Sequence, residues 1–253
     1  MKTLFVGRKL IELDRVDSTN NYAQELSEQE FIPDGTLIWA HEQYNGRGQR
    51  DATWLSQAHL NFTGSFILMP KLAVEEHFYL TKMTALAVKQ MVCAIIGKNL
   101  EGRVKIKWPN DILVDNQKIA GILIENSVRG FEIGQSIIGI GLNINQTEFD
   151  EHLPNATSLS KLTGKTFQIK ECVEILCEEL EKKYLLLKNG RLDWFDSHYL
   201  ADLFRINVWA EFKTGNTLFE GKLIGVKESG LIDIALRDGS VETFNLKEVS
   251  FVI

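Results

Sequence analysis

Residues 103–125 are the stretch that most constrains the fold of this chain, because they read as two extended segments separated by a turn. From 103 to 108, basic residues alternate with valine, isoleucine and tryptophan, which is the period of a strand with one apolar and one basic face. Turn-forming residues follow, and a second apolar run covers 119–124. The pattern predicts a β-hairpin that brings Lys107 and Lys118 close together.

This hairpin would place two ammonium groups on either side of Asn110 and Asp111. Like charges held close together repel, so the arrangement favours a site at which an anion lies between the lysines. A basic hairpin with its charges in solvent explains the same spacing equally well. The spacing alone therefore leaves both interpretations open.

The second informative stretch is residues 136–145, in which isoleucine and leucine alternate with small or amide side chains. One parity of this predicted strand is apolar, while the other ends in Gly139, Gly141, Asn143 and Asn145. Glycine weakens a strand, and it usually marks a point where another group approaches the backbone closely. A bound ligand is the favoured explanation here, although a side chain or backbone that crosses the sheet would also account for the glycines.

Two polar clusters lie nearer the N-terminus. Residues 17–20, Asp-Ser-Thr-Asn, precede an amphipathic run and are typical of a helix N-cap, which is the favoured local explanation. A helix start also offers backbone N–H groups and hydroxyls to a polar ligand. Residues 46–51, Gly-Arg-Gly-Gln-Arg-Asp, combine two glycines with two arginines, and they predict either a mobile phosphate-binding loop or a flexible surface turn.

The remaining periodicities predict an α+β chain with two domains. Helices are expected at 75–96, 168–187 and 192–204, and strands at 10–16, 36–41 and 62–69. After residue 207, five short alternating segments separated by glycine-containing turns predict a small β-barrel. The predicted boundary separates a domain of residues 1–206 from a domain of residues 207–253.

Composition and absent motifs exclude several functional classes. A net charge of −6 does not indicate a nucleic-acid-binding or membrane surface, and no apolar run approaches the ~20 residues of a membrane helix. Three cysteines do not make a disulfide framework, so a cytoplasmic location is the simplest expectation. The chain has no P-loop, no His-Glu-x-x-His motif and no nucleophile elbow, and its five histidines lack metal-ligand spacing. We therefore expect chemistry that relies on positioning and charge stabilisation.

Taken together, five motifs of this chain resemble those of the biotin–protein ligases. In the family's order they are Asp17–Asn20, Gly46–Arg50, Lys107–Asp111, Lys118–Glu125 and Gly139–Asn145. The resemblance implies a mixed β-sheet backed by helices, the class II synthetase-like fold of that family, with a small SH3-like β-barrel at the C-terminus. It also implies a biotin–[acetyl-CoA-carboxylase] ligase, in which biotin reacts with Mg²⁺·ATP to give biotinyl-5′-AMP and pyrophosphate. A lysine of a biotin carboxyl carrier domain then accepts the biotin.

The resemblance also assigns roles to individual residues. As catalytic residues it implies Lys118, which matches the family lysine at the biotin carboxylate and the α-phosphate, and Arg47 of the loop. The implied biotin-binding residues are Ser18, Thr19, Asn20, Gln43, Gly46, Arg47, Gly48, Gln49 and Lys118. The implied ATP- and adenylate-binding residues are Arg47, Arg50, Lys107, Trp108, Asn110 and Asn143, and no residue is assigned as a metal ligand.

The chain departs from the family pattern at Gln49, where many members carry arginine, and at Asp51, where glycine is common. Because the catalytic pattern begins almost at once, the resemblance implies a monofunctional ligase without the DNA-binding segment and repressor function of some members. No nucleic-acid or membrane partner is expected, and a homodimer through an exposed sheet edge is expected by analogy with some relatives. A lipoate–protein ligase of related fold and a biotin-binding module without catalysis are the alternatives.

Overall fold

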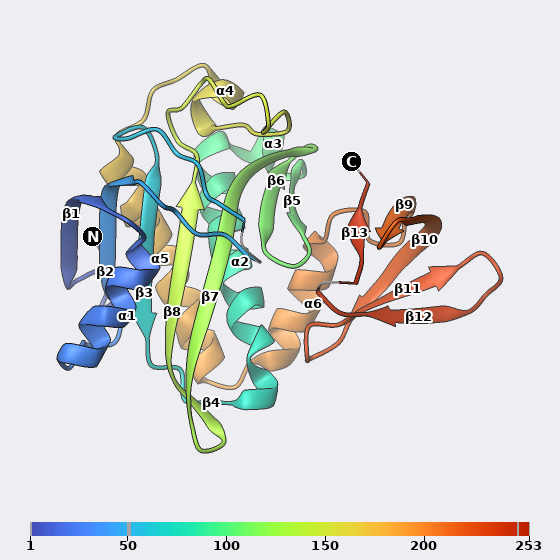
Figure 1. The fold of residues 1–253 in the computed structure, drawn as a ribbon, viewed down its shortest axis with the longest axis horizontal. Helices are drawn as coiled ribbons and strands as arrows, with labels where there is room; N and C mark the ends of the chain where they lie inside the picture. The colour runs from blue at the N-terminus through green and yellow to red at the C-terminus, as the bar shows by residue number, and fades with distance from the viewer. Residues whose placement is uncertain (1, 50–51, 247, 253) are drawn as a thin grey trace.

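A mixed eight-stranded β-sheet and a smaller antiparallel sheet organise the chain in the computed structural model, which describes residues 2–49, 52–246 and 248–252 (Figure 1). The strands of the large sheet are β1 (Leu10–Val16), β2 (Thr36–Gln43), β3 (Phe62–Leu68), β4 (Leu72–Ala73), β5 (Val104–Lys107), β6 (Asp111–Val114), β7 (Gln117–Arg129) and β8 (Glu132–Leu142). Their order is β1-β2-β3-β8-β7-β6-β5, with β4 paired to β8 outside this path. Strands β1 and β2 run parallel, and the other pairs run antiparallel.

The glycine-bearing parity of β8 lies in the middle of the large sheet. Gly141 pairs with Gly121 of β7, and Gly139 pairs with Leu123 of the same strand. On its other side β8 pairs with β3, where Ser65 stands opposite Gly139. Small residues on neighbouring strands therefore combine into one bare patch, and the alternating isoleucines of β8 face the opposite, apolar side.

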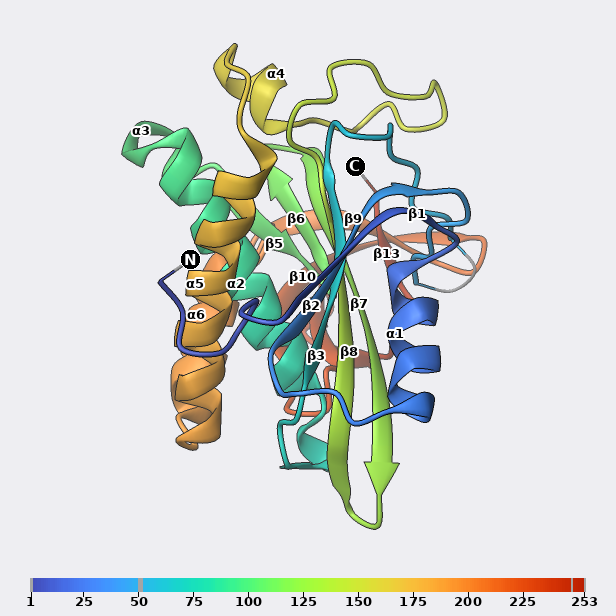
Figure 2. The same cartoon turned by 90° about the vertical axis from the view of Figure 1, so that its left-hand side faces the viewer.

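Helices cover both faces of the large sheet (Figure 2). Helix α1 (Thr19–Gln29) packs against β3 and β8 on the glycine-bearing face. The other face carries the main apolar core, under helices α2 (Phe78–Ile96), α5 (Ile169–Lys188) and α6 (Leu192–Asp202). Shorter helices are η1 (Val74–Glu76), α3 (Lys98–Glu101) and α4 (Leu159–Thr163). This architecture confirms the predicted α+β fold class with a mixed sheet backed by helices.

The segment Val74–Ile96 is long and apolar enough to cross a membrane by length and composition, with a mean hydropathy of 1.3 over its most apolar window. No such segment was expected from the sequence, because polar residues interrupt every apolar run before it reaches that length. In the structure 67% of that window is buried inside the protein, where α2 packs against α5 and the sheet. The segment is accordingly a core helix of this fold.

The three cysteines pack in the helical layer. Cys93, Cys172 and Cys177 are buried thiols without disulfide partners. Burial raises the pKa of Cys172 to about 11 and the pKa of Cys177 to about 12, so both stay protonated at neutral pH. The expectation that the three cysteines form no disulfide framework is confirmed.

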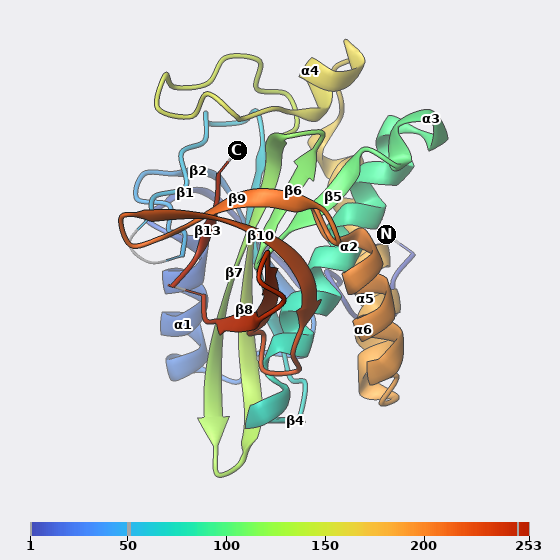
Figure 3. The ribbon, with the colours of Figure 1, turned by 90° about the vertical axis from the view of Figure 1, so that its right-hand side faces the viewer.

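The C-terminal segment forms the second sheet, which lies beside the β5 edge of the first (Figure 3). Its strands follow the order β12-β11-β10-β9-β13 and run antiparallel. They are β9 (Trp209–Thr214), β10 (Thr217–Val226), β11 (Ile232–Leu236), β12 (Val241–Phe244) and β13 (Ser250–Phe251). This second sheet is consistent with the predicted SH3-like part, and the domain boundary near residue 206 stays a prediction.

The predicted hairpin of residues 103–125 was wrong in one respect, because the structure has three strands there. After β5 the chain turns at residues 108–110, and the short strand β6 pairs with β5 on one side and with β7 on the other. Asp111 consequently stands opposite Lys107 on β5 and Gly121 on β7. The extra strand keeps the two predicted lysines near one another and inserts an acid between them.

Candidate active site

A cavity of about 250 Å³ lies on the glycine-bearing face of the large sheet. The connection between β2 and β3 crosses in front of β8 and β7 and forms one wall of it (Figure 1). The predicted residues that line it are Ser18, Thr19, Asn20, Gln43, Arg47, Gly48, Gln49, Asn110 and Lys118. The structure therefore brings together residues that are as far apart in sequence as Ser18 and Lys118.

The start of α1 supplies a polar end to this cavity. Ser18 occupies the N-cap position, yet its side chain makes no capping hydrogen bond among the described residues. Gln43 caps the helix instead, because its Oε1 accepts from the backbone N–H of Thr19 at 2.7 Å and from the Thr19 hydroxyl at 3.0 Å. Ser18 thus stands at the predicted N-cap position but does not cap the helix with its side chain. It is buried and lines the cavity.

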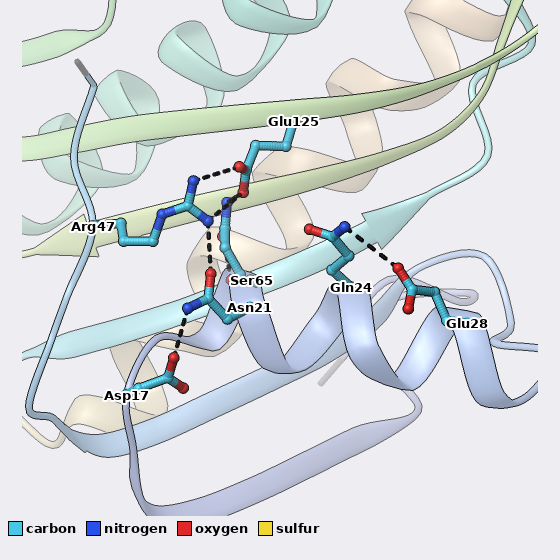
Figure 4. Close-up of polar contacts among 8 residues, drawn as sticks. Asp17, Asn21, Gln24, Glu28, Arg47, Ser65 and Glu125 are labelled. Carbon is cyan, nitrogen blue, oxygen red and sulfur yellow. Dashed lines mark hydrogen bonds and ion pairs between the residues drawn. The ribbon is translucent and has the colours of Figure 1, made fainter. Parts of the chain in front are cut away.

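A hydrogen-bond network connects this helix start to the sheet and to the loop (Figure 4). Ser65 Oγ lies 2.6 Å from Asn20 Oδ1, and Asn20 Nδ2 donates to Glu125 Oε2 at 2.7 Å. Arg47 Nη2 donates to Glu125 Oε1 at 2.7 Å, and its Nη1 donates to Asn21 Oδ1 at 2.7 Å. Arg47 is therefore held against the sheet by a partly exposed ion pair.

Two side chains cross the glycine floor of the cavity. A Cβ atom at Gly139 would lie 2.4 Å from Asn20 Oδ1, and a Cβ atom at Gly141 would lie 2.2 Å from Trp54 Cε2. The indole Nε1 of Trp54 is buried and has no hydrogen-bond partner among the residues that the structure describes. The explanation by a crossing side chain is confirmed, since Asn20 and Trp54 cover these glycines. The same glycines line the cavity, and the explanation by a bound ligand stays a prediction.

Lys118 stands at the end of the cavity opposite α1. Its Nζ lies 2.6 Å from Asp111 Oδ1 and 5.6 Å from the centre of the Trp54 ring. Its backbone is fixed on the outer side by residues 155–157, because Lys118 N–H donates to the Asn155 carbonyl and the Lys118 carbonyl accepts from Thr157. The ammonium group therefore projects into the cavity from a strand held on both sides.

The predicted proximity of Lys107 and Lys118 is confirmed, because Lys107 pairs across the sheet with Asp111, the residue that contacts Lys118. Burial lowers the pKa of Lys107, and the charges of Lys118 and Arg205 lower it further against the opposing effect of Asp111. Lys107 does not itself line the cavity, since it lies on the far side of Asp111. Asp111 is thus the shared counter-ion of this cationic cluster.

Other predicted residues lie away from the cavity. Trp108 is 4% exposed, and its Nε1 donates to the Gly230 carbonyl at 2.9 Å, so it packs at the junction between the two sheets. Asn143 is buried just past the end of β8, where its Nδ2 donates to the Thr157 carbonyl at 3.0 Å. Gly46 supports the loop by packing on Trp54. Arg50, like Asp51, lies outside the described residues.

Sequence reasoning missed four residues that build the site: Trp54, Ser65, Asp111 and Glu125. Two of them stood inside recognised motifs, but a motif does not reveal which acid pairs with which base. Trp54 follows the loop and pairs back to it, since its N–H donates to the Gly46 carbonyl at 2.9 Å. An aromatic residue shortly after a glycine-arginine loop was the available signal for its position over the floor.

Comparisons with known proteins show which family the chain belongs to. Residues 12–143 match the Biotin/lipoate A/B protein ligase family. The bifunctional ligase/repressor BirA of Bacillus spizizenii is 33% identical over 247 residues, which cover 94% of this chain and 73% of that protein. The biotin–[acetyl-CoA-carboxylase] ligase of Paracoccus denitrificans is 29% identical, with 87% of this chain and 91% of that protein covered.

A solved structure shares the whole architecture. The biotin protein ligase from Aquifex aeolicus in complex with biotin and ATP superposes with a TM-score of 0.75 at 28% identity, covering 96% of this chain and 98% of that one. The match includes the second sheet as well as the large one. The chain therefore belongs to the biotin/lipoate A/B protein ligase family and has the fold of its biotin ligases.

Proposed function

We propose that the protein is an ATP-dependent biotin–protein ligase that makes biotinyl-5′-AMP and passes its biotin to a lysine of a carrier domain. The observation that carries this proposal is the placement of two cations, Arg47 and Lys118, at one cavity over a bare glycine floor. The ligase names of the relatives, and the biotin and ATP bound by the Aquifex aeolicus protein, support it.

The proposed reaction joins two anions. A carboxylate oxygen of biotin attacks the α-phosphorus of ATP, the bond to the leaving phosphate breaks, and pyrophosphate departs. The ammonium group of Lys118 offsets the repulsion between the reacting groups. Because the fold already holds this group in place, no free energy is spent on orienting it during the reaction. In the second step the carrier lysine's amine attacks the carbonyl carbon, loses a proton and releases AMP.

The cavity divides into two ends that fit the two reactants. The α1 end offers the hydroxyls and amides of Ser18, Thr19, Asn20 and Gln43, which suit the polar head of biotin. The other end offers Lys118 and Asn110, which suit the carboxylate and the phosphates. The bare floor between them leaves room for a flat ligand.

A magnesium ion bound with ATP fits the donors at the phosphate end. Mg²⁺ takes oxygen ligands and usually uses one or two carboxylates together with substrate phosphates and water. Asp111 lines the cavity and would be that carboxylate, and no cluster of three metal-binding side chains occurs among the described residues. The ion would neutralise phosphate charge, while Lys118 exchanges its present partner Asp111 for the substrate.

Biotin-dependent exchange of pyrophosphate into ATP tests this proposal. We expect exchange with the natural chain, and Lys118→Ala should lower its rate at least about a hundredfold, because removing one such stabiliser costs about 3 kcal/mol. Lys105→Ala is the matched control, since Lys105 belongs to β5 and does not line the cavity. Full activity of Lys118→Ala would remove this residue from the mechanism.

The same assay decides between the alternatives. A lipoate ligase would support exchange with lipoate in place of biotin, and a sensing module would bind biotin without exchange or transfer of label. Incubation with a biotin carboxyl carrier domain tests the acceptor directly. A homodimer through an exposed sheet edge also stays a prediction, which sedimentation with and without biotinyl-AMP would examine.

A further inference from the structure

Glu125 occupies an unexpected place for an acid. It continues the row Gly121, Leu123, Glu125 on one face of β7, and the first two residues of that row line the cavity. A carboxylate beside a site for two anionic reactants would weaken their binding unless its charge were already engaged. Both of its oxygens are engaged, because Oε1 accepts from Arg47 and Oε2 accepts from Asn20 and Arg47.

We propose that Glu125 is a positioning residue that couples the placement of Arg47 to the orientation of Asn20. This inference rests on the function proposed above and deepens it. Glu125 joins three separate pieces of the site, namely the loop through Arg47, the start of α1 through Asn20, and β7 through its own backbone. Figure 4 shows the guanidinium group of Arg47 facing this carboxylate.

The first half of the coupling concerns Asn20. An ionised carboxylate only accepts hydrogen bonds, so the Asn20 group that faces Glu125 must be the NH2 of its amide. The amide oxygen is then forced toward Ser65 and over Gly139, where the missing side chain leaves room for it. The Ser65 hydroxyl has a single proton and donates it to this oxygen at 2.6 Å, so the acid sets the orientation of Asn20 and, through it, that of Ser65.

The second half concerns the loop. Gly48 N–H donates to the Ala52 carbonyl at 2.6 Å, and the backbones of Arg47 and Thr53 form an antiparallel β-bridge. The described parts of the loop therefore form a compact unit. Arg47 fastens this unit to the sheet through Glu125 and to α1 through Asn21. If the Asn20 amide rotates away, the Glu125 carboxylate loses one hydrogen-bond donor, and its hydrogen bonds to Arg47 shift. The positions of Asn20 and Arg47 therefore change together.

Glu125→Gln tests the coupling. Glutamine keeps the size of the side chain, but its NH2 group is a donor and would face the donors of Asn20 or Arg47. We expect the KM for biotin in the exchange assay to rise about tenfold, with kcat within about twofold of the natural value. Biotinyl-AMP should also escape about tenfold faster, measured by trapping the released compound. A merely structural role would lower the melting temperature and leave KM and the escape rate unchanged, and that result would overturn the inference.

Four further variants sharpen the test. Glu132→Gln is the matched control, an exposed acid at the start of β8 that should leave both quantities unchanged. Glu125→Asp keeps the charge but shortens its reach, so it should reproduce the rise in KM if Glu125→Gln does not fold. In the pair Arg47→Gln and Glu125→Gln, the double variant should be no worse than the worse single variant, and additive losses would overturn coupling through Arg47. Absence of exchange by the natural chain would refute the proposed function instead.

Discussion

Gly141 shows how little space the floor of the cavity leaves for a side chain. We expect Gly141→Ala to lower the rate of biotin-dependent exchange at least about tenfold, because a Cβ atom there would lie 2.2 Å from Trp54 Cε2 and would force the indole off the floor. Overpacking of this kind costs about 1–3 kcal/mol. The exchange rate and the melting temperature of the variant measure the two consequences.

A glycine on the same strand provides the control. A Cβ atom at Gly134 would lie 3.3 Å from Cδ of Arg129, a long side chain that can move aside. Gly134→Ala should therefore keep its exchange rate. An equal loss in both variants would show that β8 tolerates no alanine anywhere, and the explanation by contact with Trp54 would fail.

Single residues also show what the sequence could reveal. The alternation of residues 103–108 already placed Trp108 on the apolar face with Ile106, and both are buried in the structure. The resemblance assigned Trp108 to the nucleotide, and parity was the better guide to its position. Ion pairs such as Lys118–Asp111 lay beyond either argument, because pairing depends on how strands are ordered in the sheet.

Among the elements, the loop between β2 and β3 has the clearest expected response to ligand. We expect biotinyl-AMP to slow cleavage by trypsin after Arg47, because the adenylate adds an anionic partner for this arginine. Gel analysis of timed digests measures the protection. Equal cleavage rates with and without the adenylate would mean that the loop does not close on the product.

Helix α5 fixes the N-terminal segment through one buried acid. Glu181 accepts hydrogen bonds from the backbone N–H groups of Leu4, Phe5 and Val6 at 2.7–3.0 Å. Burial acts to raise the pKa of Glu181, but these N–H groups outweigh it, so its pKa lies below the usual 4.5. The folded state thus binds this proton less readily than the unfolded state does.

This depressed pKa gives a pH-dependent stability with a definite sign. The contribution of Glu181 is fully present above pH 4.5 and is lost as the pH falls through the lower pKa of the folded state. Glu181→Gln should lower the free energy of unfolding by about 2 kcal/mol at pH 7 and narrow the gap to the natural chain in acid. Urea unfolding at several pH values tests this, and a constant gap would contradict it.

Element positions were predictable wherever apolar periodicity was strong. The strand expected at 10–16 and the helices expected at 168–187 and 192–204 agree with β1, α5 and α6 to within two residues. Strand β6 was missed, since four residues give too short a pattern to separate it from the turn before it. Residues 155–157 flank Lys118, and no local sequence pattern encodes that long-range pairing.

At the scale of the whole molecule, the two sheets meet at the turn that precedes Asp111. Trp108 donates to the Gly230 carbonyl, Tyr199 donates to the Pro109 carbonyl at 2.9 Å, and Phe204 N–H donates to the Ile106 carbonyl at 2.8 Å. The turn that carries Asn110 toward the cavity is therefore held from behind by α6 and the second sheet. The small sheet supports the end of the cavity that Asn110 and Lys118 line, and contributes none of its described residues to the lining.

Trp108→Phe distinguishes this junction from the nucleotide contact that the resemblance implied. Phenylalanine keeps most of the packing but leaves the buried Gly230 carbonyl unpaired, which should lower the free energy of unfolding by about 1–3 kcal/mol. The KM for ATP should change by no more than about twofold, since Trp108 does not line the cavity. Urea unfolding and ATP titration of the exchange rate measure the two quantities. A large rise in KM at unchanged stability would return Trp108 to the nucleotide site, because only a lost contact with ATP would then explain both results.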